Sequence, residues 1–434
     1  MVKCFHYFKL CLYGGFFVIP QYLKEKSFSK YYKLVTVSVL LLSLLPELPA
    51  LLCVAALFVF YLVHCRKNKL QISISKTGGI IIIYDIFALI SVIWSGSRIS
   101  TLYYAFMWLC AFALFLIISG LSDTREKIEN IVLCLVGSAA ANSVLAILQM
   151  SLMAVGKSQF FPSPLYERLD LWFARLINYP LFFESAPDRV SGCFANPLAF
   201  SAFLVLIFPL SVFCAFYGAT KKRRWFSIAS SILIFFGLLF TFLRGSVVAV
   251  VLSLMMLSFA GKKPAKFMSG IASAASISML IIIYLRRGIT ASQDISTNYR
   301  LPIWKACINS FLSKPVGLGA GSENVRKMLF DNGLELVNAH NLPVEILTEL
   351  GVAGLLIFAV LVTLTVRDLF LIYNCGGWYK RYATAFGASL VGFFAMSLFE
   401  STLDLPKEIS YFVIVLACIE ATKKLAVKQY GKMK

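Results

Sequence analysis

Long, uninterrupted apolar runs limit the fold of this chain more than any other part of its sequence. Leu198–Gly218 is one such run, and similar runs recur along most of the 434 residues. A helix needs about 20 apolar residues to cross the hydrocarbon core of a bilayer. Because the runs are continuous rather than alternating with polar residues, they predict membrane-spanning helices and not the strands of a barrel.

The composition supports this interpretation. Hydrophobic residues make up 59% of the chain and charged residues only 14%, with a mean hydropathy of +0.80. Soluble domains are about 45–50% apolar and about 25% charged, so this chain has too few polar groups to cover the surface of a soluble fold. We therefore expect an all-α, polytopic integral membrane protein.

Counting the apolar runs predicts about twelve transmembrane helices, with two long connections on one side. Pro46 and Pro49 separate the first two runs, which are short, so the number could differ by about two. The runs lie near Lys33–Leu45, Leu48–His64, Gly79–Trp94, Thr101–Ser119, Ile128–Val155, Leu198–Gly218, Trp225–Thr241, Gly245–Ala260, Phe267–Leu285, Leu342–Val366, Ala383–Phe399 and Ile409–Thr422.

The net charge of +20 would suggest nucleic acid as a partner in a soluble protein. Here the basic clusters, such as Lys221–Arg224, lie between apolar runs, which is typical of cytoplasmic loops facing anionic lipid. We therefore expect a membrane lipid environment and no nucleic acid. Alternating the spans from this cluster places both termini in the cytoplasm. Residues 1–29 then form a cytoplasmic interfacial lead-in, 30–427 a single membrane domain and 428–434 a cytoplasmic tail.

The same orientation places the two long connections, about 156–197 and 286–341, on the outer face. Connections of this length are usually functional or disordered, and their aromatic and apolar residues argue against disorder. Leu165–Ile177 has an apolar stripe at helical spacing and is expected to lie flat on the outer membrane surface. We expect a functional site enclosed at this face.

Arg244 lies between two apolar runs at their outer ends, against the charge rule. A membrane-embedded arginine costs about 2.5–3.5 kcal/mol even on insertion scales. Either it extends to the surface as an ordinary helix-end arginine, or its guanidinium binds an anion such as phosphate through two parallel hydrogen bonds. The outer connections add further basic residues, each of which could equally be solvated: Arg189, Arg286, Arg287, Arg300, Lys305, Arg326 and Lys327.

His340 is the only one of the three histidines expected at the outer face. It lies beside Asn341, where the second long connection enters a helix with Pro343 in its first turn. A neutral imidazole there is a candidate general base, although a single histidine can also be structural. Glu345 and Glu349 lie four residues apart on one helical face, where they could orient His340 or neutralise an outer arginine. Nothing in this pattern requires a metal ion or a cofactor.

The eleven cysteines contain no CxxC pair, and most lie within apolar runs, as expected of small buried residues. Cys193 and Cys307 are placed by this topology in the two outer connections. A disulfide between them would join the connections if their Cα atoms lie within about 7 Å.

The order of these features resembles the O-antigen ligase and polymerase superfamily. The resemblance covers roughly Arg189 to Gly354, and the individual motifs are weak although their order is more specific. Leu243 departs from the family pattern, in which a small polar residue commonly precedes the arginine. The matching segments are Arg189–Pro197, Thr241–Gly245, Arg300–Trp304, Pro315–Gly321 and His340–Gly351.

The resemblance implies an inverting, metal-independent glycosyltransferase of the bacterial cytoplasmic membrane. Its donor would be a polyprenyl-diphosphate-linked glycan at the outer face, and its acceptor a lipid A core, a second lipid-linked glycan or a protein. Arg244 and Arg300, with Arg189, would bind the diphosphate, and His340 would accept the proton of the acceptor hydroxyl. The alternative is a glycolipid flippase or other transporter, in which intramembrane charge would mark a pathway. The sequence shows no internal repeat with paired broken helices, which favours the transferase.

Overall fold

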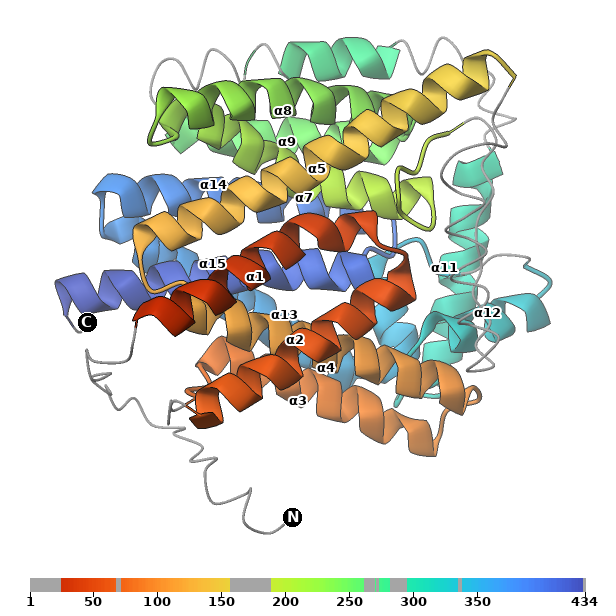
Figure 1. Ribbon diagram of the computed structural model, residues 1–434. Coiled ribbons are helices and arrows are strands. Elements are labelled where there is room, and N and C mark those ends of the chain that lie inside the picture. The colour runs from red at the N-terminus through yellow and green to blue at the C-terminus, as the bar shows by residue number, and fades with distance from the viewer. Residues whose placement is uncertain are drawn as a thin grey trace.

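The computed structural model describes residues 25–67, 72–156, 189–260, 270, 273–281, 295–334 and 338–431. Within these ranges all regular elements are helical, and most of the long helices run side by side in one bundle (Figure 1). The helices are α1 (Glu25–Leu41), α2 (Glu47–Lys67), α3 (Lys76–Ile90), α4 (Arg98–Leu121), α5 (Arg125–Ala154), α7 (Pro197–Tyr217), α8 (Lys221–Phe240), α9 (Arg244–Ala260), α11 (Ile295–Ser313), α12 (Ser322–Asp331), α13 (Leu342–Asn374), α14 (Gly377–Ser397) and α15 (Pro406–Tyr430).

Seven helices in the described ranges are long and apolar enough to cross a membrane: α2, α3 with the 3-10 turn that follows it, α4, α5, α7, α8 and α13. Tyr31–Leu44 and Arg244–Ser258 are shorter apolar helices. The polytopic helical fold is therefore confirmed, whereas the number of about twelve spans, predicted from run length, is not. The expected break between the first two runs is present, because a short 3-10 turn and Pro46 separate α1 from α2.

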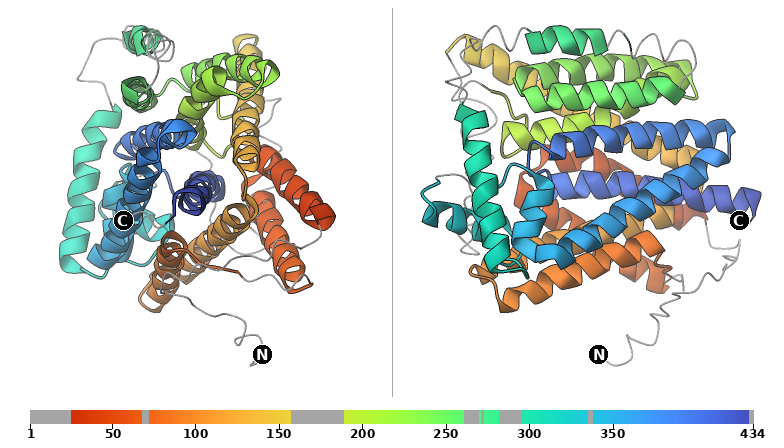
Figure 2. Two further views of the ribbon diagram at one scale, coloured as in Figure 1. Left: turned by 90° about the vertical axis from the view of Figure 1, so that its left-hand side faces the viewer. Right: turned by 180° about the vertical axis from the view of Figure 1, so that it is seen from behind.

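Helix α15 occupies the centre of the bundle. Viewed from the end that carries the C-terminus, it is surrounded by the other helices (Figure 2), and every side chain from Pro406 to Thr422 is buried. This run includes charged residues such as Lys407, whose Nζ lies 3.3 Å from the carboxylate of Glu47. Neighbouring helices shield such groups from lipid, so a helix too charged to satisfy a hydropathy criterion can still belong to the bundle core.

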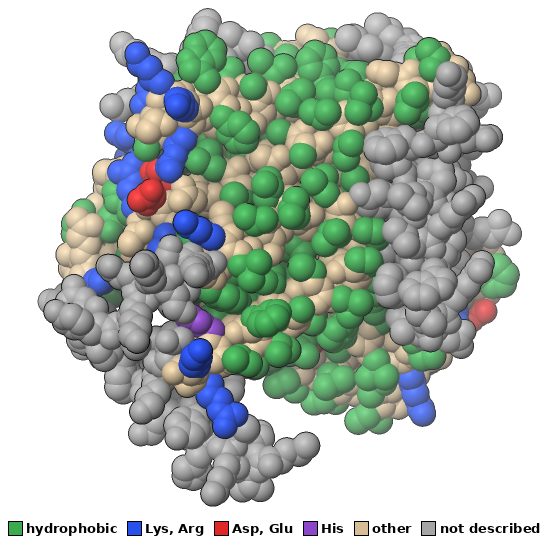
Figure 3. Space-filling model, in the orientation of Figure 1, with side chains coloured by type: hydrophobic (Ala, Val, Ile, Leu, Met, Phe, Trp, Pro, Cys, Tyr) green, Lys and Arg blue, Asp and Glu red, His purple; other side chains and the backbone are tan. Residues whose placement is uncertain are grey.

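The two ends of the bundle differ in charge. Lys and Arg side chains gather along one edge, where α5, α8 and α14 begin and α15 ends (Figure 3). At the opposite end α11 runs across the bundle instead of along it, with α12 beside it (Figures 1 and 2). The segment expected as the second outer connection therefore contains two helices. The expected helices at Leu165–Ile177 and Phe267–Leu285 lie outside the described residues, the latter except for 270 and 273–281.

A small separate core holds α11 and α12 against the segment that precedes α13. It is formed by six buried residues: Ile303, Ala306, Cys307, Val325, Leu329 and Ala339. Because Ala339 immediately precedes His340, the packing of these two helices determines where the histidine lies.

The sequence left open a disulfide between Cys193 and Cys307, and the structure does not form it: neither cysteine is in a disulfide, and both are buried. Cys307 is enclosed in the small core between α11 and α12. The backbone amide of Cys193 instead donates to the side chain of Asn142 on α5, at 3.1 Å. Different neighbours thus enclose the two residues, and burial raises the pKa of the Cys307 thiol to about 12.

Candidate active site

His340 lies in the last turn before α13, as the sequence predicted. Asn341 caps this helix, because its side-chain oxygen accepts from the amide of Val344 at 3.1 Å, and a proline occupies the first turn. The backbone of His340 is in the left-handed region, with φ of +48°. A non-glycine residue adopts this conformation only when its surroundings stabilise it, so the local contacts of His340 carry information about the site.

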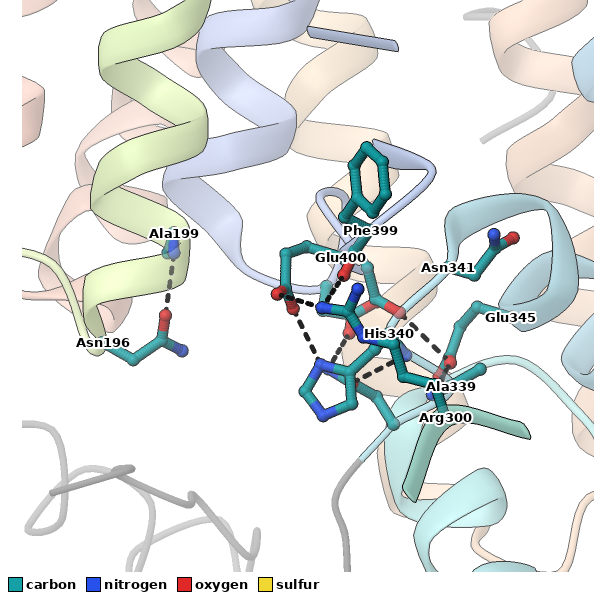
Figure 4. Close-up of polar contacts among 12 residues, drawn as sticks. Asn196, Ala199, Arg300, Ala339, His340, Asn341, Glu345, Phe399 and Glu400 are labelled. Atoms are coloured by element: carbon teal, nitrogen blue, oxygen red, sulfur yellow. Dashed lines mark hydrogen bonds and ion pairs between the residues drawn. The ribbon is translucent and has the colours of Figure 1, made fainter. Parts of the chain in front are cut away.

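The imidazole of His340 contacts a carboxylate that comes from a distant part of the chain. Its Nδ1 lies 2.7 Å from Oε2 of Glu400, in the turn between α14 and α15. Nη2 of Arg300, on α11, lies 3.3 Å from Oε1 of the same carboxylate and donates to the carbonyl of Phe399 at 3.1 Å. Figure 4 shows His340 and Arg300 on this one carboxylate. The tertiary structure thus joins two of the predicted site residues, His340 and Arg300, through Glu400, which was not predicted.

The peptide before His340 is fixed from both sides. Oε2 of Glu345 accepts from the amide of Ala339 at 2.5 Å, and Nε1 of Trp304 donates to the carbonyl of Ala339 at 3.0 Å. Glu345 also accepts from the hydroxyl of Ser401 at 3.2 Å, next to Glu400. The suggestion that Glu345 orients His340 therefore has a physical basis, although it acts through the backbone and not through the imidazole.

Glu349 is also buried, but it faces the glycine-rich turn at 315–321 and not an arginine. Its side chain accepts from the backbone of Gly321, and its carbonyl accepts from the amide of Gly319 at 2.9 Å. That carbonyl is available because α13 is broken at Gly351, where φ is +64°. A Cβ on Gly317 would lie 2.3 Å from this carbonyl oxygen. The glycines thus permit close packing of this turn against the break in α13. This packing accounts for the glycine-rich sequence without a phosphate-binding role.

Arg244 is the first residue of α9 and follows a tight turn in which Phe242 has a φ of +52°. Its neighbour Gly245 packs against Phe399, because an added Cβ there would be 3.3 Å from that side chain. The guanidinium of Arg300 lies over the ring of Phe399 at 5.8 Å from its centroid. The start of α9 therefore adjoins the turn that contains Glu400.

Arg189 lies at the same end of the bundle, in the segment that leads into α7. The next amide, of Val190, donates to the carbonyl of Phe240 at 3.4 Å, which places the segment against the end of α8. Gln149 accepts from the amide of Gly192 at 2.9 Å and holds the segment to α5. Asn196 caps α7 by accepting from Ala199 at 2.8 Å (Figure 4). The segment is thus fixed against both α8 and α5 at this end of the bundle.

Sequence analysis missed Glu400 and Asp404. Oδ2 of Asp404 accepts from Nδ2 of Asn338 at 3.0 Å, and burial raises the pKa of Asp404 to about 7. Both acids lie in a short polar turn between two apolar runs, which is the same kind of placement that drew attention to Arg244. Their distance along the chain from His340 gives no indication that they contact its segment.

In the ranges that the structure describes, no group of three or more His, Cys, Asp and Glu side chains could hold a metal ion. The site residues within these ranges are instead a histidine, carboxylates and arginines gathered at one end of a multi-pass helical bundle. This combination defines the class as a polytopic α-helical membrane protein with a polar site at the bundle end.

Residues 229–359 match the family model described as O-antigen ligase. Over this region the chain is similar to the O-antigen ligase family, which supports the resemblance to the O-antigen ligase and polymerase superfamily seen in the sequence. The family implies a glycosyltransferase-like enzyme of bacterial membranes that uses a lipid-linked glycan and an acceptor. Comparison with curated proteins gives no match. The matched region contains Arg244, Arg300, His340, Glu345 and Glu349, and ends before Glu400.

Proposed function

We propose that this protein transfers a glycan from a polyprenyl-diphosphate-linked donor to an acceptor hydroxyl, with inversion at the anomeric carbon and without a metal ion. The observation that carries this proposal is the placement of His340 and Arg300 on the two oxygens of Glu400, at 2.7 and 3.3 Å. A general base and a group that binds phosphate are thereby held side by side.

His340 is suited to act as the base because its partner determines its tautomer. When Nδ1 carries the proton and donates it to Glu400, Nε2 carries the lone pair that can accept a proton. In Figure 4 this second nitrogen points away from Glu400. An acceptor hydroxyl bound at Nε2 would give up its proton as its oxygen attacks the anomeric carbon.

The arginines are suited to bind the donor diphosphate. The contacts of Arg300 with Glu400 and Phe399 both use Nη2, so Nε and Nη1 can donate to phosphate oxygens. Arg244 and Arg189 supply further positive charge from the neighbouring helix ends. Fixed positive charge stabilises the diphosphate as its bond to the anomeric carbon breaks, and attack on the opposite face of the sugar inverts the configuration.

The two ends of the bundle support an outward-facing site. The basic end, with the starts of α5, α8 and α14, corresponds to the cytoplasmic side under the positive-inside rule. The end that carries His340 would then face outward in the bacterial cytoplasmic membrane, and the carboxyl end of α15 would be cytoplasmic. Donors of this class would reach the site from the outer leaflet, and the acceptor would be a lipid A core, a second lipid-linked glycan or a protein.

The proposal is tested with purified protein in detergent and a lipid-linked glycan donor, by measuring both glycan transfer and release of polyprenyl diphosphate. A transporter would release no polyprenyl diphosphate. His340→Gln should lower the transfer rate per folded molecule by about 10²–10⁴, the usual contribution of a general base. The matched control is His64→Gln, because His64 stacks on Tyr31 in α1 and lies in the last turn of α2, at the basic end. Wild-type transfer by His340→Gln would eliminate the assignment of the base.

A further inference from the structure

The carboxylate of Glu400 serves two groups at once. Oε2 bonds the imidazole of His340 at 2.7 Å, and Oε1 pairs with the guanidinium of Arg300 at 3.3 Å. The side chain of Glu400 is 10% exposed, compared with 20% for His340 and 25% for Arg300. Because this carboxylate is largely buried, the guanidinium of Arg300 and the imidazole of His340 share one negative charge, and a change at Arg300 alters the electrostatic field at His340.

The charged groups near His340 come from several elements of the fold. They are Arg300 on α11, Glu345 on α13, and Glu400 and Asp404 in the turn before α15, while Arg244 adjoins that turn from the start of α9 and Glu349 follows Glu345 by one turn of α13. Asp404 interacts electrostatically with His340 and also accepts from Asn338, whereas Glu345 acts on the histidine segment through the amide of Ala339. In the described part of the site, Glu400 is the acid whose side chain contacts the imidazole itself.

We propose that Glu400 is a positioning residue that couples donor binding to the basicity of His340. This inference rests on the function proposed above. Without donor, Arg300 neutralises part of the Glu400 charge. When a diphosphate binds at Nε and Nη1 of Arg300, its negative charge offsets the positive charge of the guanidinium, and the Glu400 carboxylate stabilises the imidazolium of His340 more strongly. The base is then strongest when the diphosphate is in place.

The coupling fits the chemistry of the transfer. The acceptor proton moves to Nε2 of His340 while the acceptor oxygen bonds to the anomeric carbon, and the diphosphate departs with the electron pair of the broken bond. The imidazolium formed in this step is stabilised by Glu400 and later releases its proton to water. An empty donor site leaves His340 a weaker base, so that proton removal is favoured only when a leaving group is present.

The experiment follows the titration of His340 in the full-length protein by NMR of labelled histidine. The chain has only three histidines, and His340→Gln assigns the signal. The probe is inorganic pyrophosphate, measured with wild type, Glu400→Gln and Glu323→Gln. Gln at 400 keeps an oxygen for Nδ1 but removes the charge. Glu323 is the matched control, since it is a buried acid at the same end of the bundle that pairs with Arg326 on its own helix at 2.8 Å.

Pyrophosphate should raise the pKa of His340 by about one unit in wild type and in Glu323→Gln. In Glu400→Gln the rise should fall to less than half, leaving only the direct field of the bound anion. An equal rise in Glu400→Gln, or no rise in wild type, would overturn the coupling. The titration does not require turnover, so the two proposals can fail separately. If pyrophosphate shifts the pKa of His340 in a protein that has no transferase activity, the proposed function is refuted and the coupling stands. If the protein transfers glycan but pyrophosphate does not shift this pKa, the coupling is refuted and the proposed function stands.

Discussion

Replacing Trp304 by Phe should slow glycan transfer, although the proposed mechanism gives Trp304 no direct role in the chemistry at His340 or Glu400. Nε1 of Trp304 donates to the carbonyl of Ala339 at 3.0 Å. Phe keeps an aromatic ring of similar shape and removes this donor. The carbonyl belongs to a fully buried residue, so water cannot easily replace the lost bond.

The size of the effect follows from comparing the backbone strain at His340 with the free energy of the hydrogen bond that opposes it. The left-handed backbone of His340, with φ of +48°, costs about 1–2 kcal/mol compared with an ordinary conformation. A hydrogen bond contributes about 0.5–1.5 kcal/mol, and a buried carbonyl left without a donor costs about 1–3 kcal/mol. The lost bond is therefore comparable with the strain that it opposes. Because about 1.4 kcal/mol corresponds to a tenfold change in rate, we expect about a tenfold decrease in kcat.

The assay is single-turnover transfer with saturating donor, expressed per folded molecule in detergent. The matched control is Trp94→Phe. Trp94 lies at the same end of the bundle, and its buried Nε1 has no hydrogen-bond partner among the described residues. The same substitution there removes no bond and should leave kcat unchanged. Donor KM should stay near the wild-type value in both variants, because neither side chain is placed at the diphosphate.

A Trp304→Phe protein that transfers within twofold of wild type would show that the Ala339 peptide does not hold His340 in place. A decrease that appears only as less folded protein would likewise contradict the positioning role, because it would reflect stability alone.

Three further predictions concern charge. Arg244→Lys and Arg300→Lys should each reduce transfer by about tenfold or more, because an ammonium keeps the charge but loses the planar two-point contact; near-normal transfer by both would show that neither binds the diphosphate. Burial raises the pKa of Asp404 to about 7, so the unfolded chain releases this proton first and stability falls as the pH rises from about 4 to about 7. The thermal midpoint of Asp404→Asn should therefore decline less than that of wild type over this range, and parallel declines would contradict this. Reporter fusions should place Asp331 outside and Lys222 in the cytoplasm, and the opposite result at Asp331 would remove the outward-facing site.

The sequence alone was sufficient for the class of protein. Continuous apolar runs and a low charge content predict a polytopic helical fold, because a bilayer leaves few other ways to satisfy the backbone. It also located the helix that begins after His340, through Asn341 as the cap and a proline in the first turn. The ordered motifs predicted a resemblance to the O-antigen ligase and polymerase superfamily, which the match over 229–359 supports.

The apolar run Ile409–Thr422 located the helix in the centre of the bundle but not its full length. Helix α15 carries charged residues such as Lys407 and Glu420, both buried, and it does not satisfy the criteria for a membrane span. Neighbouring helices surround α15 in place of lipid, and this arrangement depends on how the bundle packs. Apolar runs therefore do not by themselves give the number of spans.

Only the tertiary structure decided which groups meet at the site. The sequence placed Glu345 and Glu349 closest to His340, yet the imidazole contacts Glu400, which lies 60 residues away along the chain. It also allowed Cys193 and Cys307 to pair, whereas different surroundings enclose each thiol. Helical periodicity and charge rules act over a few residues or over the thickness of a membrane. Contacts between side chains on separate helices depend on how the bundle packs, which no local pattern encodes.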